Sequence, residues 1–207
     1  MWMKISLTDA GKRFNRDWIF RHLTYEFSAR ESYAIIGPNG SGKSTLLQVL
    51  SGSMQLNEGN IQHSTLNTQH STEEVYNQVS ICAPYLELVE EMTLLEFLEF
   101  HSQFKPFISS VSINEIIKII DLEAAVNKQI RNYSSGMKQR VKLAQAIFSD
   151  VPLVLLDEPC TSLDSTGIEL YLRLINEYCL NRMVIVSSND EAEYGFCREK
   201  VNILEFK

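Results

Sequence analysis

The chain has 207 residues, of which 44% are hydrophobic and 22% charged, and its formal net charge is −7. This length and composition fit one globular core, with room for an appended subdomain. The negative net charge and the lack of a basic run argue against nucleic-acid binding. Every apolar run is too short to span a membrane. The N-terminus lacks the long apolar core of a signal peptide.

Three strands are predicted at the start of the chain. Residues Lys4 to Thr8 alternate apolar and polar side chains, and a similar alternation returns from Ile19 to Phe27, with Phe14 in the polar stretch between them. Tyr33–Ile36 is a continuous apolar run, which is typical of a strand buried on both faces.

A glycine-rich loop follows the third strand: Gly37-Pro38-Asn39-Gly40-Ser41-Gly42-Lys43-Ser44-Thr45. It opens into the apolar run Leu46–Leu50, which predicts a helix that ends at Gly52. Strand, loop and helix are the context in which the P-loop pattern G-x-x-x-x-G-K-[ST] binds phosphate, through loop N–H groups and the helix N-terminus. We expect Lys43 to reach the β- and γ-phosphates of a nucleotide and the Ser44 hydroxyl to bind Mg²⁺.

The next segment carries few signals. Glu58–Asn60 predicts a turn, and the polar stretch 63–78 is expected to be a loop or a short insertion. A short strand over Val79–Ala83 then ends at Pro84.

The histidines and cysteines do not predict a metal centre. His63 and His70 lack a third ligand nearby, so we expect both to be solvated at the surface. The four cysteines lack C-x-x-C spacing, which is typical of reduced structural thiols in a cytosolic protein; they are Cys82, Cys160, Cys179 and Cys197.

Residues from about 85 to 150 are rich in helical patterns. Thr93 and Glu96 form a predicted capping box for a helix that runs to about Phe104, and 113–120 is a second helical segment. A third helix is predicted over 136–149. Its apolar face is expected in the core and its basic face in solvent; the first comprises Met137, Val141, Ala144 and Phe148, and the second Lys138, Arg140 and Lys142.

The last part of the chain alternates strands and helices. Strands are predicted at 153–156, 183–187 and 201–206, with a helix over 165–181. This alternation favours a largely parallel sheet covered by helices.

An acidic pair, Asp157 and Glu158, follows the strand at 153–156, at the end where α/β sheets bind ligands. We expect Asp157 to hold Mg²⁺, directly or through water, opposite Ser44. Glu158 would then polarise the attacking water. The alternative is a strand end with two solvated carboxylates, which the nearby P-loop makes the weaker interpretation.

Four motifs in this order resemble the nucleotide-binding subunit of ATP-binding-cassette (ABC) proteins, and the resemblance covers nearly the whole chain. They are the P-loop, Tyr133–Met137, Leu155–Pro159 and Ser162–Asp164; Ser134-x-Gly136 with Gln139-Arg140 is the most specific part. The resemblance implies an α/β P-loop NTPase core with a mainly parallel sheet, an N-terminal antiparallel β part and an inserted helical subdomain. Residues 1–207 would form a single ABC-type ATPase domain, with core 1–84 and 151–207 and helical subdomain about 85–150.

The resemblance also implies roles for residues outside the P-loop. In the family two subunits pack head to tail, so Ser134, Ser135 and Gly136 would contact the γ-phosphate bound by the partner's P-loop; the same residues also satisfy an ordinary Ser-capped helix start. Asp164 resembles the aspartate that links the two subunits. Phe14 resembles the aromatic residue that stacks on adenine, with a buried packing role as the alternative.

Three positions depart from the family. Ser135 replaces the first glycine of the signature, and Asn189 stands where a histidine usually contacts the γ-phosphate. An asparagine can donate a hydrogen bond there but cannot carry a charge. The usual glutamine at the start of the helical lobe is absent, and Tyr85 or Glu87 would replace it. We expect slow but real hydrolysis that depends on dimer formation.

The expected function is an ATP-binding and hydrolysing subunit of an ABC transporter that uses ATP and Mg²⁺, with Glu158, Lys43 and Asn189 as catalytic residues. Its partners would be itself or a homologous ATPase subunit and integral membrane subunits contacted through Leu86–Met92, with no nucleic acid. It would lie on the cytoplasmic face of the membrane. Its variant of the signature, Tyr133–Arg140, looks more like those of exporters. The alternatives are a soluble ABC-type switch and a poorly hydrolysing regulatory subunit.

Overall fold

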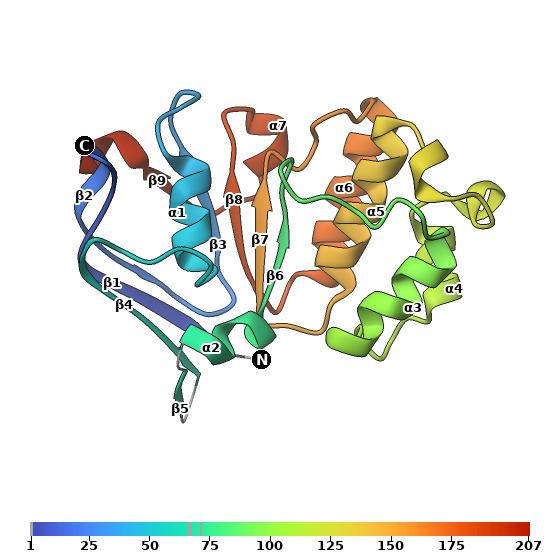
Figure 1. The fold of residues 1–207 in the computed structure, drawn as a ribbon, viewed down its shortest axis with the longest axis horizontal. Helices are drawn as coiled ribbons and strands as arrows, with labels where there is room; N and C mark the ends of the chain where they lie inside the picture. The colour runs from blue at the N-terminus through green and yellow to red at the C-terminus, as the bar shows by residue number, and fades with distance from the viewer. Residues whose placement is uncertain (1, 66–67, 71) are drawn as a thin grey trace. The chain divides into compact units, whose positions relative to one another are not determined.

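The computed structural model describes residues 2–65, 68–70 and 72–207. The chain forms two compact units (Figure 1). The first comprises Met1–Ile81, Val151–Glu158 and Asn181–Lys207, and the second comprises Cys82–Asp150 and Pro159–Leu180. The helix-rich segment expected at 85–150 thus lies in the second unit, which also takes in 159–180.

One sheet of the first unit is antiparallel, with strand order β2-β1-β4-β5. Its strands are β1 (Lys4–Phe14), β2 (Asp17–Phe27), β4 (Glu58–Thr65) and β5 (Thr68–His70). The two predicted N-terminal strands are confirmed and extend further than expected. The turn predicted at Glu58–Asn60 is wrong, because these residues begin β4 and pair with β1. The pairing with β1 prevails over the local turn signal.

His63 is buried rather than solvated. It has 5% of its surface exposed, and its Nε2 lies 2.8 Å from the carbonyl oxygen of Leu50. Strand β4 continues to Thr65, so the segment predicted as a loop begins as a strand, and α2 (Thr72–Val75) and the 3-10 helix η1 (Tyr76–Gln78) follow β5. We also expected His70 to be solvated, but its side chain lies outside the part of the chain that the structure describes.

The other sheet has strand order β6-β7-β8-β3-β9. Its strands are β6 (Val79–Cys82), β7 (Leu153–Asp157), β8 (Met183–Ser187), β3 (Ser32–Ile36) and β9 (Glu199–Asn202). Strand β3 runs parallel to β8 and β9, and β7 runs parallel to β8. Every residue of β7 and β8 is buried, and helix α1 (Lys43–Leu50) packs against both (Figure 1). Parallel strands bring their carboxyl ends to one edge. Here the P-loop follows β3, Asp157 ends β7, and Asn189 lies just beyond β8.

The chain does not close with the strand predicted at 201–206. Strand β9 ends at Asn202, and a 3-10 helix, η4 (Ile203–Phe206), follows it. The Asn202 side-chain oxygen accepts a hydrogen bond from the backbone N–H of Leu204 at 3.1 Å, so this side chain caps η4 and ends the strand. The short helix α7 (Glu191–Tyr194) lies before β9.

The second unit is helical, with α3 (Leu94–Phe104), α4 (Ile113–Ile119), α5 (Ser135–Phe148), α6 (Ser165–Tyr178) and the short 3-10 helices η2 (Glu123–Ala125) and η3 (Ile130–Asn132). Helices α5 and α6 lie side by side, and α3 packs on α4 and α5 (Figure 1). The capping box predicted at Thr93 is confirmed, because the Glu96 carboxylate accepts the Thr93 N–H at 2.8 Å. Among the described residues, no helix combines the length and apolarity needed to cross a membrane.

Candidate nucleotide-binding site

The P-loop bends tightly before α1. Gly42 caps the helix with φ of 103°, in the left-handed region, and a Cβ built on it would lie 2.2 Å from the Ile19 Cγ2 atom. A side chain at this position would therefore be both strained and in collision. The buried Lys43 ammonium donates hydrogen bonds to the carbonyl oxygens of Gly37 at 2.8 Å and Pro38 at 3.3 Å. The loop thus keeps a cation at its centre, as phosphate binding requires.

A cavity of about 210 Å³ lies over the P-loop in the first unit. The structure brings together here most of the predicted phosphate-binding residues and the predicted catalytic carboxylate; the lining residues are Ile19, Asn39, Gly40, Gly42, Lys43, Ser44, Thr45 and Glu158. Residues that carry an ammonium, two hydroxyls and a carboxylate therefore line the same space as the glycines of the loop. Such a set can bind a nucleotide phosphate chain and activate a water beside it.

Asp157 and Glu158 are adjacent but have different surroundings. Asp157 ends β7 with 2% of its surface exposed, and its Oδ1 has no hydrogen-bond partner within the described ranges. The hydroxyl oxygen of Ser187, at the end of the neighbouring strand, is likewise unpartnered there. Buried oxygens without partners are costly, and a hard cation would satisfy them. These oxygens and the Ser44 hydroxyl fit the donor set that Mg²⁺ prefers.

Glu158 leaves the strand through a left-handed turn. Its φ is 44°, and its N–H donates to the carbonyl oxygen of Ser187 at 2.9 Å. A left-handed non-glycine residue is costly unless its surroundings hold it, and such residues gather at functional sites. This turn places Glu158 on the cavity while Asp157 stays in the strand.

Asn189 contacts the P-loop directly. Its side-chain amide donates a hydrogen bond of 2.7 Å to the side-chain oxygen of Asn39. The sequence predicted only a phosphate contact for Asn189. The partner was missed because the two residues are 150 positions apart and nothing local marks the pair.

Phe14 lies at the end of β1 with 46% of its surface exposed, which excludes the packing role. The Lys12 ammonium lies 5.3 Å from the centre of its ring. The ring is not among the residues that line the P-loop cavity. It is free to stack on a flat ligand, and adenine stacking stays a prediction.

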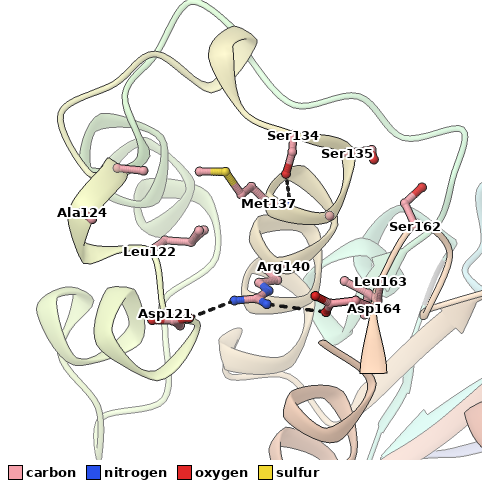
Figure 2. A pocket seen from close by; sticks show the side chains of 12 residues that line it. Asp121, Leu122, Ala124, Ser134, Ser135, Met137, Arg140, Ser162, Leu163 and Asp164 are labelled. Carbon is pink, nitrogen blue, oxygen red and sulfur yellow. Dashed lines mark hydrogen bonds and ion pairs between the residues drawn. The ribbon is translucent and has the colours of Figure 1, made fainter. Parts of the chain in front are cut away.

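The signature residues begin α5 in the second unit. Ser134 caps the helix by accepting the Met137 N–H at 3.2 Å, and both Ser134 and Ser135 are exposed. A Cβ on Gly136 would lie 3.0 Å from the carbonyl oxygen of Ser162, so this glycine lets the loop before α6 approach the helix. Figure 2 shows the cavity of about 390 Å³ that these residues line.

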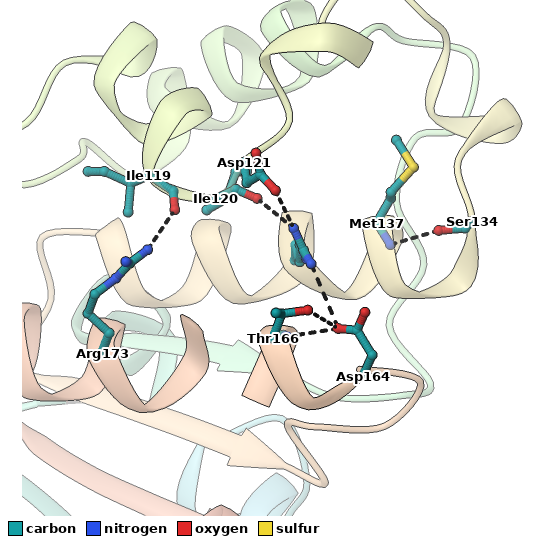
Figure 3. Close-up of polar contacts among 10 residues, drawn as sticks. Ile119, Ile120, Asp121, Ser134, Met137, Asp164, Thr166 and Arg173 are labelled. Atoms are coloured by element: carbon teal, nitrogen blue, oxygen red, sulfur yellow. Dashed lines mark hydrogen bonds and ion pairs between the residues drawn. The ribbon is translucent and has the colours of Figure 1, made fainter. Parts of the chain in front are cut away.

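Asp164 caps α6 on the other side of the same cavity. Its carboxylate accepts hydrogen bonds from the Gly167 N–H at 2.8 Å and the Thr166 hydroxyl at 3.0 Å (Figure 3). These two bonds lower the pKa of the Asp164 carboxyl, with a smaller contribution from the Arg140 guanidinium 3.9 Å away. Asp164 therefore presents a fixed negative charge at an exposed helix start.

The basic face of α5 is not simply solvated. Lys138 pairs with Glu90 at 2.6 Å, Arg140 with Asp121 at 3.3 Å, and Lys142 donates to the Pro84 carbonyl at 3.2 Å. These contacts were not predictable because the partners lie 19 to 58 positions away.

The segment proposed to replace the missing glutamine lies on the surface. Tyr85 and Glu87 are both exposed, and Glu87 lines a cavity of about 250 Å³ within the second unit. Val89 is exposed in the same segment, and the carbonyl of Glu90 accepts the Arg131 N–H at 2.9 Å. Tyr85 and Glu87 both stay predictions for the replacement of the glutamine.

All four cysteines are reduced thiols, and three of them are buried. Burial raises the pKa of Cys197 to about 12, so its thiol is unreactive at neutral pH. Among the described residues, no group of three or more histidine, cysteine or acidic side chains is placed to hold a metal.

The chain matches known proteins over most of its length. The family model described as "ABC transporter" matches residues 20–161. The uncharacterized ABC transporter ATP-binding protein YcbN of Bacillus subtilis is 27% identical over 84% of this chain and 58% of that protein. The bacitracin transport ATP-binding protein BcrA of Bacillus licheniformis is 26% identical over 88% of this chain and 60% of that protein. The chain thus spans rather more than half the length of these two relatives.

Solved structures share the fold. A dimeric ATP-binding cassette in a post-hydrolysis state with ADP and phosphate has a TM-score of 0.80, at 23% identity over 96% of this chain and 93% of that one. The predicted α/β class is confirmed by this likeness and by the two sheets. The family resemblance inferred from the motifs is confirmed by the family model, which covers more than half of the sequence. The chain therefore belongs to the ABC transporter family.

Proposed function

We propose that this chain binds ATP with Mg²⁺ and hydrolyses it to move a substrate through separate membrane subunits by closure of an ATPase dimer. The observation that carries the proposal is the shared cavity in which Glu158 faces the P-loop. A carboxylate beside a phosphate-binding loop can orient and polarise the attacking water. A site built only to hold a nucleotide would not need it.

The roles follow from the contacts. The P-loop N–H groups and Lys43 would hold the phosphates, and Ser44 and Asp157 would bind the metal, which neutralises phosphate charge when bound. Asn189 would donate to the γ-phosphate from the position in which it now contacts Asn39. Phe14 would stack on adenine with its exposed ring face.

A second subunit would complete the site. Ser134, Ser135 and Gly136 lie at the N-terminus of a 14-residue helix, whose free N–H groups suit a phosphate. The related cassette that was solved as a dimer with ADP and phosphate supports this arrangement. The partner would be a second copy or a homologous ATPase subunit, packed head to tail, with Asp164 linking the two.

The membrane partner would dock on the second unit through Leu86–Met92, where Leu86 and Val89 are exposed. The chain would then be peripheral, on the cytoplasmic face of the membrane. A poorly hydrolysing regulatory subunit is the second candidate. Asn189 favours it, because an amide cannot carry the charge of an imidazolium.

The first experiment is to tag the chain in its own cells, solubilise the membranes gently and identify what co-purifies. A polytopic membrane protein in near-equal amount is expected, and ATP turnover by that complex should depend on Glu158. Recovery with ribosomes, DNA-repair proteins or nothing would contradict the transporter role. A membrane complex that binds ATP without multiple turnover would establish the regulatory role instead.

A further inference from the structure

The six residues that follow Glu158, 159–164, form a short loop that we call the exit loop. It connects the predicted catalytic carboxylate to Asp164, the cap of α6. Three residues of the first half of α5 contact it or leave room for it: Gly136, Gln139 and Arg140. The helix that begins with the signature therefore holds the exit loop along its length.

Gln139 makes the strongest of these contacts. Its side-chain amide donates a hydrogen bond of 2.7 Å to the carbonyl oxygen of Pro159 and lies 3.6 Å from the sulfur of Cys82. Only 5% of Gln139 is exposed. A buried amide is tolerated where its hydrogen-bonding groups are satisfied, and here the bond partner is the residue that directly follows Glu158.

Gly136 and Arg140 lie close to the rest of the exit loop. The Ser162 carbonyl approaches Gly136 so closely that a Cβ would meet it at 3.0 Å. The Arg140 guanidinium lies 3.3 Å from the Asp121 carboxylate and 3.9 Å from that of Asp164. Figure 2 draws Arg140 between these two carboxylates. The middle and the far end of the loop thus lie close to the same helix as its start.

Hydrogen bonds hold the backbone at Glu158 and at the residue after it. Its own N–H donates to the Ser187 carbonyl, and the carbonyl of the following residue, Pro159, accepts from the Gln139 side chain. Because φ of Glu158 is 44°, in a region that side chains disfavour, the direction of its carboxylate depends on these restraints. Loss of the Gln139 bond would free the Pro159 carbonyl and let the backbone that leads away from Glu158 shift, and the carboxylate would move with it relative to the P-loop.

We propose that Gln139 is a positioning residue for hydrolysis, which fixes the backbone after Glu158 to the helix that carries the signature. This inference rests on the proposed function, since it assigns Glu158 to the attacking water. It predicts a specific defect: ATP still binds, because the P-loop is unchanged, but the chemical step is slow. Displacements as small as 1 Å can cost on the order of 100-fold in rate.

The test uses Gln139→Met, which keeps the volume of the side chain and removes its donors. The matched control is Gln145→Met on the same helix, a half-buried glutamine with no side-chain hydrogen bond among those described. ATP affinity, single-turnover hydrolysis and amide hydrogen exchange over the exit loop are measured on the full chain, below the unfolding temperature of each variant.

For Gln139→Met we expect ATP affinity within about twofold of the wild type, hydrolysis at least ~10-fold slower and faster exchange in the exit loop. Gln145→Met should match the wild type in all three measurements. Unchanged hydrolysis in Gln139→Met, or a loss of affinity parallel to the loss of rate, would overturn the proposal. If the wild type itself does not hydrolyse ATP, the proposed function fails. The positioning contact can still be judged in that case, because unchanged amide hydrogen exchange in the exit loop of Gln139→Met would refute it.

Discussion

Glu158 lies on the P-loop cavity next to an aspartate that stays in the strand, so the two carboxylates can be separated by mutation. Glu158→Gln preserves shape but removes the charge that would polarise water. We expect this variant to bind ATP normally and to accumulate as an ATP-bound dimer, with turnover reduced by at least ~100-fold. Size-exclusion chromatography with light scattering, with and without MgATP, measures the dimer.

Glu205→Gln is the matched control, because Glu205 is an exposed acid of the same unit, in η4. It should turn over ATP like the wild type and show no ATP-stabilised dimer. If Glu158→Gln stays monomeric with ATP, or hydrolyses it at the wild-type rate, the role given to Glu158 is wrong.

Asn189 and Asn39 form a hydrogen-bonded pair of side-chain amides, and the pair can be tested as a unit. A neutral hydrogen bond contributes ~1 kcal/mol, so Asn189→Ala and Asn39→Ala should each slow hydrolysis roughly fivefold. If the two residues act through their mutual contact, the double variant should be no slower than the slower single variant. Steady-state ATPase rates of the wild type, the two single variants and the double variant form a double-mutant cycle that measures this coupling. Multiplicative losses would show that the two amides act separately.

Helix α3 carries a partly buried titratable group, His101, that is unrelated to the nucleotide site. Burial, aided by the nearby Lys105 ammonium, lowers the pKa of His101 from 6.5 to about 4. The unfolded chain therefore binds this proton more readily than the folded chain, so its contribution to stability is complete above about pH 6.5 and is lost as the pH falls towards 4.

Denaturant unfolding at several pH values between 4 and 7 measures this contribution. The wild type should lose stability on acidification through that window, and His101→Asn should show a shallower loss. The His101 ring nitrogen is 2.9 Å from the Ser149 hydroxyl, so the variant is expected to be less stable at pH 7. Parallel pH profiles for the two proteins would contradict the assignment to His101.

Elements with strong local chemistry were predictable from the sequence. The P-loop, the buried strands β3, β7 and β8, and the capping box at Thr93 depend on residues close together in the chain. Their residue types restrict the backbone locally, so the pattern suffices. The α/β fold class was likewise predictable, because the family motifs are local sequence patterns.

Features that depend on distant partners were not predictable. His63 is buried because strand pairing with β1 places it near Leu50, and β9 ends early because Asn202 caps the next helix. Gln139 belonged to a recognisable motif, but its bond to Pro159 joins residues 20 positions apart. The candidate site was therefore predictable as a set of residues, whereas the contacts that orient them required the structure.

At the scale of the whole molecule, the proposed composite site would require two chains, and this can be tested by mixing two variants that are each expected to be inactive. Lys43→Ala would destroy the P-loop of its own subunit and leave the signature intact. Ser134→Arg would block the signature and leave the P-loop intact. In a mixed head-to-tail dimer, the P-loop of the second variant faces the signature of the first, so one of the two sites is whole.

An equimolar mixture should contain about half mixed dimers, each with one working site, and should recover about a quarter of the wild-type ATPase activity. Each variant alone is the control and should remain inactive at the same total concentration, while Ser134→Arg should still bind ATP. A mixture no more active than its components would contradict a composite site. If Ser134→Arg alone hydrolysed ATP at the wild-type rate, each chain would build its site alone. The signature serine would then be only the cap of α5, whose hydrogen bond to Met137 already accounts for it.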